Sequence, residues 1–336
     1  MMRRLREISL EDIGGGINLL DLGASGQLPD YWKPLSHLTN IIGFDPNADE
    51  CDRLNQQKTG FHSQIFLPYP ISGETREFTL YKTKSIYCWS LLEPNLKWLR
   101  RFSFSDLFEM VSSDAIAAYA LADVPEIQGV DVDAMKLDTQ GLELPILKAA
   151  QRLVESCILI ETETGFCENY KGETTFDQIA QYMSSMGFSL FDINADHRIP
   201  RRNTLAGASR QEQILWCEAI WMRDLLSTDH EAVVNLSREK ALKALCLYAN
   251  HGCYSFGLEA AEFFYNKGLI WKEEYETLRH DVSCWELGTR KQRRSLKKKL
   301  LRSTLDLVPR RFFGSIVSVL EDLRRSRHPI ARLLRS

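Results

Sequence analysis

A short apolar run that ends in an acidic residue occurs four times in this sequence, at Asp21, Asp45, Asp138 and Glu161. Apolar runs of this length are typical of strands that are buried on both faces of a parallel sheet. Stretches with a helical pattern lie between them, and alternating strands and helices indicate an α/β fold. The pattern of residues 14–225 therefore predicts five strand–helix units followed by a pair of strands.

Capping and turn residues predict where individual helices begin and end. Asn47 and Thr174 are the expected helix N-caps, and Gly187 is expected to end the second of these helices. Helices are expected at residues 47–58, 96–111, 139–156 and 174–186. Further strands are expected at residues 64–67 and 78–81, with a neighbouring pair at residues 188–193 and 215–222.

The chain has 336 residues, more than the roughly 100 to 200 that one domain usually contains. We predict a lead-in at residues 1–13, an α/β domain at residues 14–226 and an all-α appendage at residues 230–336. The appendage is predicted because helical patterns at residues 231–247 and 258–278 appear without further strands.

Charge is distributed unevenly along the chain. The whole sequence has 42 basic and 45 acidic residues, but residues 290–336 contain 15 basic and 3 acidic ones. This basic tail would suit contact with an anionic membrane surface, docking on the acidic main domain, or nucleic acid, which we consider unlikely.

The expected compartment is the cytoplasm, possibly with peripheral contact on the inner face of the membrane. No apolar stretch is long enough to span a bilayer, and the basic start lacks the apolar region of a signal peptide. The 8 cysteines form no CxxC pair, which predicts free thiols in a reducing compartment. The 7 histidines form no metal-binding pair, so a divalent metal is possible but not indicated.

The first strand leads into Asp21-Leu22-Gly23-Ala24-Ser25-Gly26, where small residues let a ligand approach the backbone. Asp45 ends the next strand, where a carboxylate can hold ribose hydroxyls. A dinucleotide site would need a middle glycine and an uninterrupted helix, whereas Pro29 and Pro34 interrupt the helix here. We therefore favour S-adenosylmethionine; the alternative is that the glycines only form a tight turn that Asp21 caps.

A series of segments resembles the FkbM family of S-adenosylmethionine-dependent methyltransferases. The segments are NLLDLGASG, IIGFDP, SLLEPN, MKLDTQGLELPILKAA, LIETE, NYKGETTFDQI and MGFSLFDI. The resemblance implies a class I methyltransferase fold, which is a Rossmann-like sheet with one antiparallel strand. It also implies O-methylation, often in glycan or natural-product pathways.

The resemblance assigns cofactor-binding positions, and the chain departs from the family at three places. The cofactor-binding candidates are Asp21, Gly23, Ala24, Ser25, Gly26, Asp45, Pro46 and Ser72. Family members usually have Asn at position 25 and Glu at positions 45 and 140, where this chain has Ser25, Asp45 and Gln140. Gln140 removes a charge beside Asp138, so any metal-binding or substrate-positioning role that the family's acid has at position 140 is in doubt for this chain.

Methyl transfer to a hydroxyl needs alignment and a group that accepts the alcohol proton. Acids at strand ends are the natural candidates, and we predict Asp138 or Glu161 as the catalytic base. The alternative for Asp138 is that it caps the helix that starts near Gly141. The candidates for substrate contact are Gln140, Glu143, Glu163, Tyr170 and His197.

The predicted acceptor is a saccharide or a related small molecule. Arg198, Arg201 and Arg202 would suit an anionic acceptor, or they lie in a solvated loop. Three aromatic residues are either sugar-stacking platforms or core residues, namely Trp89, Tyr170 and Trp216. A different class of function is also open, in which a catalytically weak or inactive binding protein keeps the fold and acts through its basic tail.

Overall fold

The computed structural model describes residues 8–26, 28–202, 213–226 and 236–280. The chain divides into two compact units, Met1–Arg279 and His280–Ser336. All of the described residues except His280 belong to the first unit. The predicted membrane-contacting tail lies outside the described residues.

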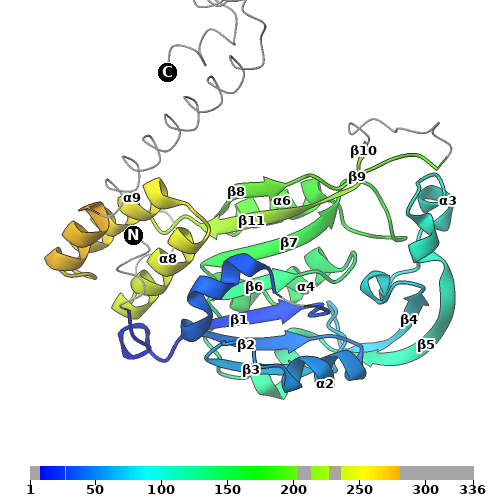
Figure 1. The fold of residues 1–336 in the computed structure, drawn as a ribbon, viewed down its shortest axis with the longest axis horizontal. Coiled ribbons are helices and arrows are strands. Elements are labelled where there is room, and N and C mark those ends of the chain that lie inside the picture. The colour runs from blue at the N-terminus through cyan, green and yellow to red at the C-terminus, as the bar shows by residue number, and fades with distance from the viewer. Residues whose placement is uncertain (1–7, 27, 203–212, 227–235, 281–336) are drawn as a thin grey trace, which may run out of the picture. The chain divides into compact units, whose positions relative to one another are not determined.

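A seven-stranded sheet forms the centre of the first unit, with the strand order β3-β2-β1-β6-β7-β11-β8 (Figure 1). Strand β11 is antiparallel to both of its neighbours, and the other adjacent strands are parallel. The strands are β1 (Ile17–Leu22), β2 (Thr39–Phe44), β3 (Ser63–Leu67), β6 (Ala134–Leu137), β7 (Leu159–Gly165), β8 (Phe188–Asn194) and β11 (Trp216–Arg223). This topology confirms the predicted class I methyltransferase fold with one antiparallel strand.

Helical elements lie on both faces of the sheet (Figure 1). They include η2 (Asp30–Leu38), α2 (Ala48–Gln56), α4 (Glu143–Ala149), α5 (Gln151–Ser156) and α6 (Phe176–Ser185). The segment η2 is a 3-10 helix that contains Pro34, in line with the predicted interruption after the first strand. The predicted helix at 139–156 is divided in two at Ala150, where α4 ends and α5 begins.

Two capping predictions can be compared with the structure. Asn47 is the N-cap of α2, because its side chain accepts a hydrogen bond from the Glu50 N–H at 3.4 Å. The N-cap of α6 is Thr175 rather than Thr174, because Thr175 forms a capping box with Gln178. Gly187 follows α6 with a φ of 79°, as expected for a left-handed residue after a helix.

The predicted helix at residues 96–111 is wrong. Only α3 (Leu96–Leu99) is helical in the α sense, and β5 (Met110–Ala118) begins at the end of this segment. Strand β5 pairs antiparallel with β4 (Arg76–Thr83), which includes the predicted strand at 78–81. Between α3 and β5, the Ser103 N–H donates a hydrogen bond to the Pro200 carbonyl oxygen. The backbone of this segment therefore bonds to a distant part of the chain instead of continuing a helix.

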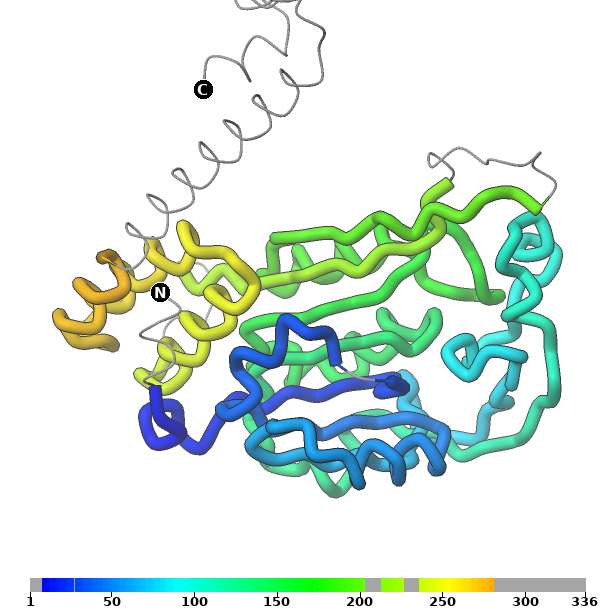
Figure 2. Tube along the Cα trace, in the orientation of Figure 1, coloured from blue at the N-terminus to red at the C-terminus, as the bar shows by residue number. Residues whose placement is uncertain are grey.

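Helices α8 (Arg238–Asn250) and α9 (Tyr254–Asn266) lie within the same compact unit as the sheet, and residues 272–280 are also helical (Figure 2). The predicted helix at 258–278 is therefore interrupted after α9. The Lys240 and Lys243 ammonium groups reach Asp133, which is fully buried, at 2.8 and 2.7 Å. These contacts join α8 to the segment that leads into β6, while the predicted domain boundary near residue 230 stays a prediction.

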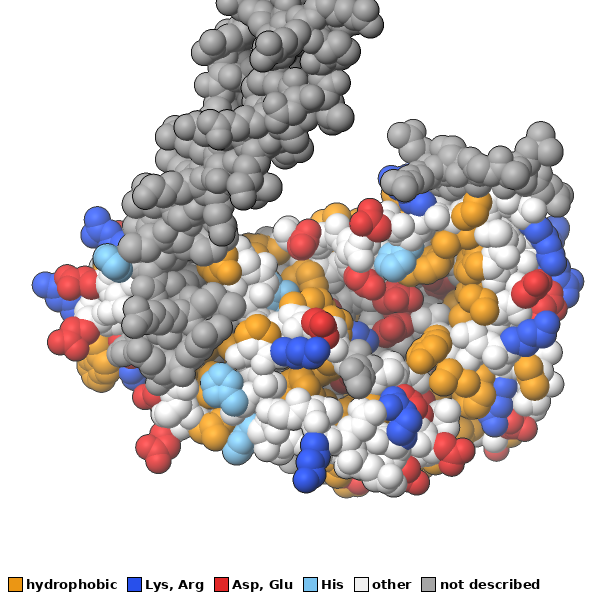
Figure 3. Space-filling model, viewed as in Figure 1, with side chains coloured by type: hydrophobic (Ala, Val, Ile, Leu, Met, Phe, Trp, Pro, Cys, Tyr) orange, Lys and Arg blue, Asp and Glu red, His pale blue; other side chains and the backbone are white. Residues whose placement is uncertain are grey.

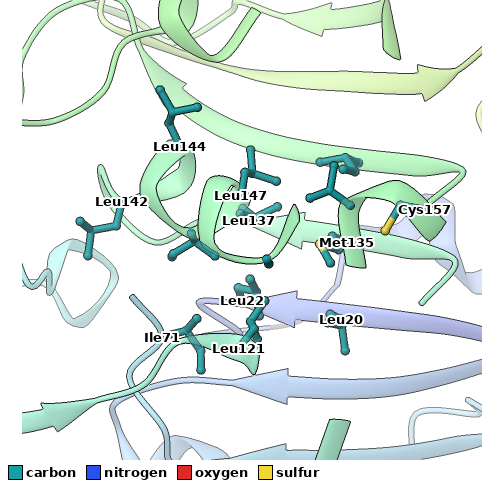
Figure 4. Packing of buried hydrophobic residues seen from close by; sticks show 14 of the residues in the cluster. Leu20, Leu22, Ile71, Leu121, Met135, Leu137, Leu142, Leu144, Leu147 and Cys157 are labelled. Atoms are coloured by element: carbon teal, nitrogen blue, oxygen red, sulfur yellow. The ribbon is translucent and has the colours of Figure 1, made fainter. Parts of the chain in front are cut away.

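The main hydrophobic core lies between the sheet and the helices of one face. In Figure 4, Leu137 of β6 lies beside Leu147 of α4, and Leu22 of β1 belongs to the same cluster of buried residues. All three are fully buried, which makes this layer the rigid support for the loops that follow β1 and β6. None of the described helices is both long and apolar enough to cross a membrane.

Candidate active site

Two cavities adjoin at the ends of the parallel strands, and they share Tyr87, Asp138 and Gln140. The first cavity is lined by residues after β1 and β2 and by residues 69–71 and 86–91. The second has a volume of about 340 Å³ and is lined by residues after β6, by Glu163, Thr164 and Gly165 at the end of β7, and by residues from the segments 104–108 and 169–173. Figure 3 shows acidic side chains in a hollow of this face, with hydrophobic side chains around it.

In the first cavity, Asp45 is held by two donors. The Ser25 hydroxyl donates to Asp45 Oδ2 at 2.9 Å, and the Asn47 N–H donates to Oδ1 at 2.8 Å. Burial raises the pKa of Asp45, although these hydrogen bonds oppose the rise. A preoriented carboxylate at the end of β2 can accept hydrogen bonds from a pair of ribose hydroxyls.

Gly23 lies where the loop after β1 crosses the loop after β6. Its φ is 79°, and a Cβ atom added there would collide with the Asp138 carbonyl oxygen. Glycine is therefore required for both backbone conformation and space. This close crossing leaves the backbone itself to form the wall of the first cavity.

The other predicted cofactor residues fall in different places. Ser25 and Pro46 line the first cavity with Gly23 and Asp45. Another three of them line a separate, third cavity near η2, namely Asp21, Ala24 and Gly26. Ser72 is 1% exposed, lines none of these three cavities and donates its N–H to Tyr119.

Lys136 is a site residue that the sequence reading missed. Its ammonium lies 3.4 Å from Asp21 Oδ1 and 3.8 Å from Asp138 Oδ2. Burial raises the pKa of Asp21 even though Lys136 opposes the rise. The signal was available, because alternation along a strand places Lys136 and Asp138 on the same side.

The five predicted substrate residues all line the second cavity. They are Gln140, Glu143, Glu163, Tyr170 and His197. The Gln140 side chain connects two carboxyl groups: its NH2 group donates to Asp138 Oδ1 at 2.7 Å and to Glu163 Oε1 at 3.2 Å. The buried Tyr170 hydroxyl donates to the Gln140 side-chain oxygen at 2.8 Å, which fixes the orientation of the amide.

The backbone of Gln140 is unusual. Gln140 is the one described non-glycine residue with a positive φ, which is 54°. The Ser90 hydroxyl donates to the Gln140 carbonyl oxygen at 2.8 Å and stabilises this conformation. Left-handed non-glycine residues cost about 1 to 3 kcal/mol and persist where the surroundings hold them, often at active sites.

Two glutamates, the buried Glu143 and the half-buried Glu173, complete the wall of the second cavity. Glu143 Oε1 accepts hydrogen bonds from the backbone N–H groups of Thr139 and Gly141 at 2.9 and 3.2 Å. Glu173 Oε2 accepts from the N–H groups of Asn169 and Tyr170 at 2.6 and 2.9 Å. Burial raises the pKa of Glu143 to about 7 and that of Glu173 to about 8.

Glu161, the second predicted catalytic residue, lines neither of the two adjoining cavities. Its carboxylate accepts hydrogen bonds from the Tyr31 hydroxyl at 2.7 Å and from Trp32 Nε1 at 3.1 Å. Burial raises its pKa to about 7, against the opposing effects of Tyr31 and Lys136. Its surroundings are those of a buried structural acid, whereas Glu163, two residues later, faces the second cavity.

Two of the predicted loop arginines bind elsewhere. The Arg202 guanidinium lies 3.1 Å from Asp106, and Arg201 stacks on Phe102 at 4.2 Å. Neither lines the second cavity. His197 does line it, and its ring stacks on that of Trp216 with 4.9 Å between centroids.

The aromatic candidates divide between the two cavities. Trp89 lines the first cavity, and Tyr170 and Trp216 line the second. Tyr87, which the sequence reading passed over, lines both and is 61% exposed, so it lies at the opening. Across the described part of the chain, no group of three or more His, Cys, Asp or Glu side chains is arranged to hold a metal ion.

Residues 38–190 match the family model of the methyltransferase FkbM domain. The matched segment contains Asp45, Asp138, Gln140 and Glu163. Among curated proteins, none matches this sequence significantly.

Similar solved structures include a magnesium protoporphyrin IX methyltransferase from Synechocystis with bound S-adenosylmethionine. It is 10% identical, the alignment covers 66% of this chain and 79% of that one, and the TM-score is 0.32. A TehB-like S-adenosylmethionine-dependent methyltransferase from Corynebacterium glutamicum is 13% identical over 62% of this chain and 81% of its own, with a TM-score of 0.30. Over residues 38–190, slightly less than half of its length, the chain is therefore similar to the methyltransferase FkbM domain.

Proposed function

We propose that this protein transfers a methyl group from S-adenosylmethionine to a hydroxyl group of a saccharide or a related small molecule. The observation that carries the proposal is the pair of adjoining cavities with Asp138 and Gln140 at their junction. Methyl transfer requires donor and acceptor to meet in line at one point. A side chain at the junction is within reach of both.

The residues of the first cavity suit the donor. S-adenosylmethionine would supply a methyl group on a positively charged sulfur. Asp45 would hold the ribose hydroxyls, and Gly23 would let the backbone approach the ligand closely. Asp21 lines the third cavity rather than the first, but Lys136 lies 3.4 Å from it and 3.8 Å from Asp138 of the first cavity, so this pair of charges would suit the amino and carboxylate groups of an amino-acid moiety.

Asp138 is the best-placed proton acceptor for the hydroxyl. It lines both cavities, and Gln140 holds one of its oxygens at 2.7 Å. Glu163 is bound by the same amide and is a second carboxyl group within the acceptor cavity. The alternative that Asp138 caps a helix is less favourable, because the N–H groups at the start of that turn donate to Glu143 instead.

Turnover and cofactor binding should be measured separately in Asp138→Asn, Glu163→Gln and Glu161→Gln. Calorimetry with S-adenosylhomocysteine reports binding, and transfer of a labelled methyl group to a panel of sugars and lipid-linked sugars reports turnover. We expect Asp138→Asn to lose about a hundredfold in turnover while retaining cofactor affinity. Wild-type turnover by both Asp138→Asn and Glu163→Gln would reject the assignment.

The alternative is a binding protein that keeps the fold without transferring methyl groups. Binding of S-adenosylhomocysteine without methylation of any acceptor in the panel would favour it. A binding protein of this kind would act through its basic tail, residues 290–336.

For the tail we propose peripheral contact with an anionic membrane on the cytoplasmic side. The proposal rests on its 15 basic and 3 acidic residues, each basic residue near such a surface contributing about 1 kcal/mol. Sedimentation with phosphatidylserine vesicles at two salt concentrations tests it. Sedimentation at low salt that decreases at high salt is expected, and absence of binding at low salt would reject the proposal.

A further inference from the structure

We propose that the second cavity selects an acceptor that carries a protonated amino group in addition to the hydroxyl that is methylated. This inference rests on the proposed function and specifies its substrate class. An amino sugar is the simplest molecule with this chemistry.

The charge of the cavity wall is the first reason. Four carboxyl groups line it, namely Asp138, Glu143, Glu163 and Glu173. None of the described residues that line it is lysine or arginine. The ammonium group that the structure shows closest to this wall is that of Lys136, 3.8 Å from Asp138 and 3.4 Å from Asp21, and Lys136 does not line the cavity.

The second reason is a buried carboxylate oxygen of Glu143 with no partner. Glu143 is 1% exposed and lines the cavity. Its Oε1 accepts hydrogen bonds from Thr139 and Gly141, whereas Oε2 has no hydrogen-bond partner. An unsatisfied buried carboxylate oxygen costs free energy, and an ammonium donor would remove that cost by a charge-assisted hydrogen bond.

The remaining wall also suits an amine-bearing ring. Phe104, Phe108 and Trp216 pack together with ring centroids 5.2 and 5.8 Å apart, and all three line the cavity. Aromatic faces attract cations as well as the apolar faces of sugar rings. A volume of about 340 Å³ is large enough for a small ligand of this kind.

An anionic acceptor would meet the opposite environment. The nearby cations Arg201 and Arg202 are directed to Phe102 and Asp106 rather than into the cavity. A uronic acid would therefore place its carboxylate among four carboxyl groups, with Lys136 beside Asp138 as the cation that the structure shows near them. Those of the four groups that are ionised would repel the ligand's carboxylate, and repulsion between like charges in a buried site is strongly unfavourable.

Ligand-observed NMR titrations with the full-length protein, saturated with S-adenosylhomocysteine, would test this. The probes are glucosamine, N-acetylglucosamine and glucuronic acid at pH 7.5, at which Glu143, with a pKa of about 7, is mostly ionised. We expect glucosamine to bind at least tenfold more tightly than N-acetylglucosamine, since a charge-assisted bond replaces a neutral one. Glucuronic acid should bind most weakly.

Variants identify the group responsible. Glu143→Gln keeps an oxygen acceptor for Thr139 and Gly141 and should abolish the preference for glucosamine. Glu163→Gln is a second variant at the same cavity in case the first does not fold. Glu276→Gln is the matched control, because Glu276 is an exposed helical glutamate far from the lining.

Each outcome has one meaning. Equal or absent binding of all three sugars, with normal binding of S-adenosylhomocysteine, overturns the amine preference and leaves the proposed function intact. Failure to bind S-adenosylhomocysteine counts against the proposed function itself. A preference for glucosamine that persists in both cavity variants would also reject the proposed site.

Discussion

Glu161 Oε1 lies 3.6 Å from His251 Nε2, and the side chains of both residues are 7% exposed. His251 follows α8, and its ring packs against Tyr31 and Trp32 of η2, which also donate hydrogen bonds to Glu161. Burial lowers the pKa of His251 to about 4, so its ring is neutral near neutral pH. The α8–α9 turn and η2 are therefore joined to β7 through one buried carboxyl group.

This arrangement makes stability depend on pH through Glu161. Its pKa is about 7 in the folded protein, above the usual 4.5, so the folded state holds the proton more tightly than the unfolded state. Stability from this group is therefore present below about pH 4.5 and is lost as the pH rises to about 7, by up to about 3 kcal/mol. Urea denaturation at pH 5 and pH 8 should show a smaller decrease for Glu161→Gln than for the wild type. The same decrease in both proteins would contradict the prediction.

Gly23→Ala should abolish cofactor binding. A methyl group there collides with the Asp138 carbonyl oxygen and also meets an unfavourable φ of 79°. Gly252→Ala is the matched control, since Gly252 has a φ of 73° and nothing within 4 Å of the added atom. We expect affinity for S-adenosylhomocysteine to fall more than tenfold in Gly23→Ala only, with both variants losing about 1 kcal/mol from the backbone conformation. Equal affinities in calorimetry would show that the crossing loops can separate.

Gln140 should act as a positioning residue for Asp138. Gln140→Ala removes both donated hydrogen bonds, so we expect a decrease in kcat of about tenfold to a hundredfold with little change in cofactor affinity. Gln140→Glu places a third carboxyl group beside Asp138 and Glu163, which should move the acidic limb of the pH–rate profile to higher pH. Tyr170→Phe should have a smaller effect, because it removes only the bond that orients the amide. A purely structural role would lower stability without moving the pH profile.

Asp133 should be a major determinant of stability. It is fully buried and binds Lys240, Lys243 and the Asn18 N–H. Asp133→Asn leaves the buried Lys243 ammonium without its counter-charge, whereas Lys240 keeps Asp131 at 3.2 Å, and the loss should cost about 3 to 5 kcal/mol. Lys272→Met is the control, because that lysine is 71% exposed and its ion pair at 3.8 Å should contribute less than about 1 kcal/mol. Denaturant unfolding of the two variants would measure the difference.

Local sequence patterns predicted the sheet, and four of the eight predicted cofactor residues, Gly23, Ser25, Asp45 and Pro46, line the first cavity, while their role in binding the cofactor stays a prediction. Apolar runs that end in Asp45 or Asp138 identify parallel strands, and such strands bring their carboxyl ends to one edge. The residues predicted to contact substrate lie together in the second cavity, because Gln140 follows β6 and Glu163 lies near the end of the neighbouring β7. Those inferences need only the period of a strand and the order of the elements.

The errors arose where distant segments decide the local structure. Residues 96–111 have apolar spacing that suits a helix, yet β5 begins within them because β4 supplies a pairing partner. Glu161 seemed equivalent to Glu163 from strand alternation, but His251 and η2 cover it. Lys136 was missed although it required only the same alternation.

The pairing of Asp133 with Lys243 has a consequence for synthesis on the ribosome. These residues are 110 positions apart, so the carboxylate that precedes β6 is made long before its counter-charge. Until α8 emerges from the ribosomal exit tunnel, the nascent sheet would have to bury an unpaired charge. The strands alone therefore cannot complete the folding of the first compact unit during translation. Completion of the fold requires α8, which supplies the counter-charge.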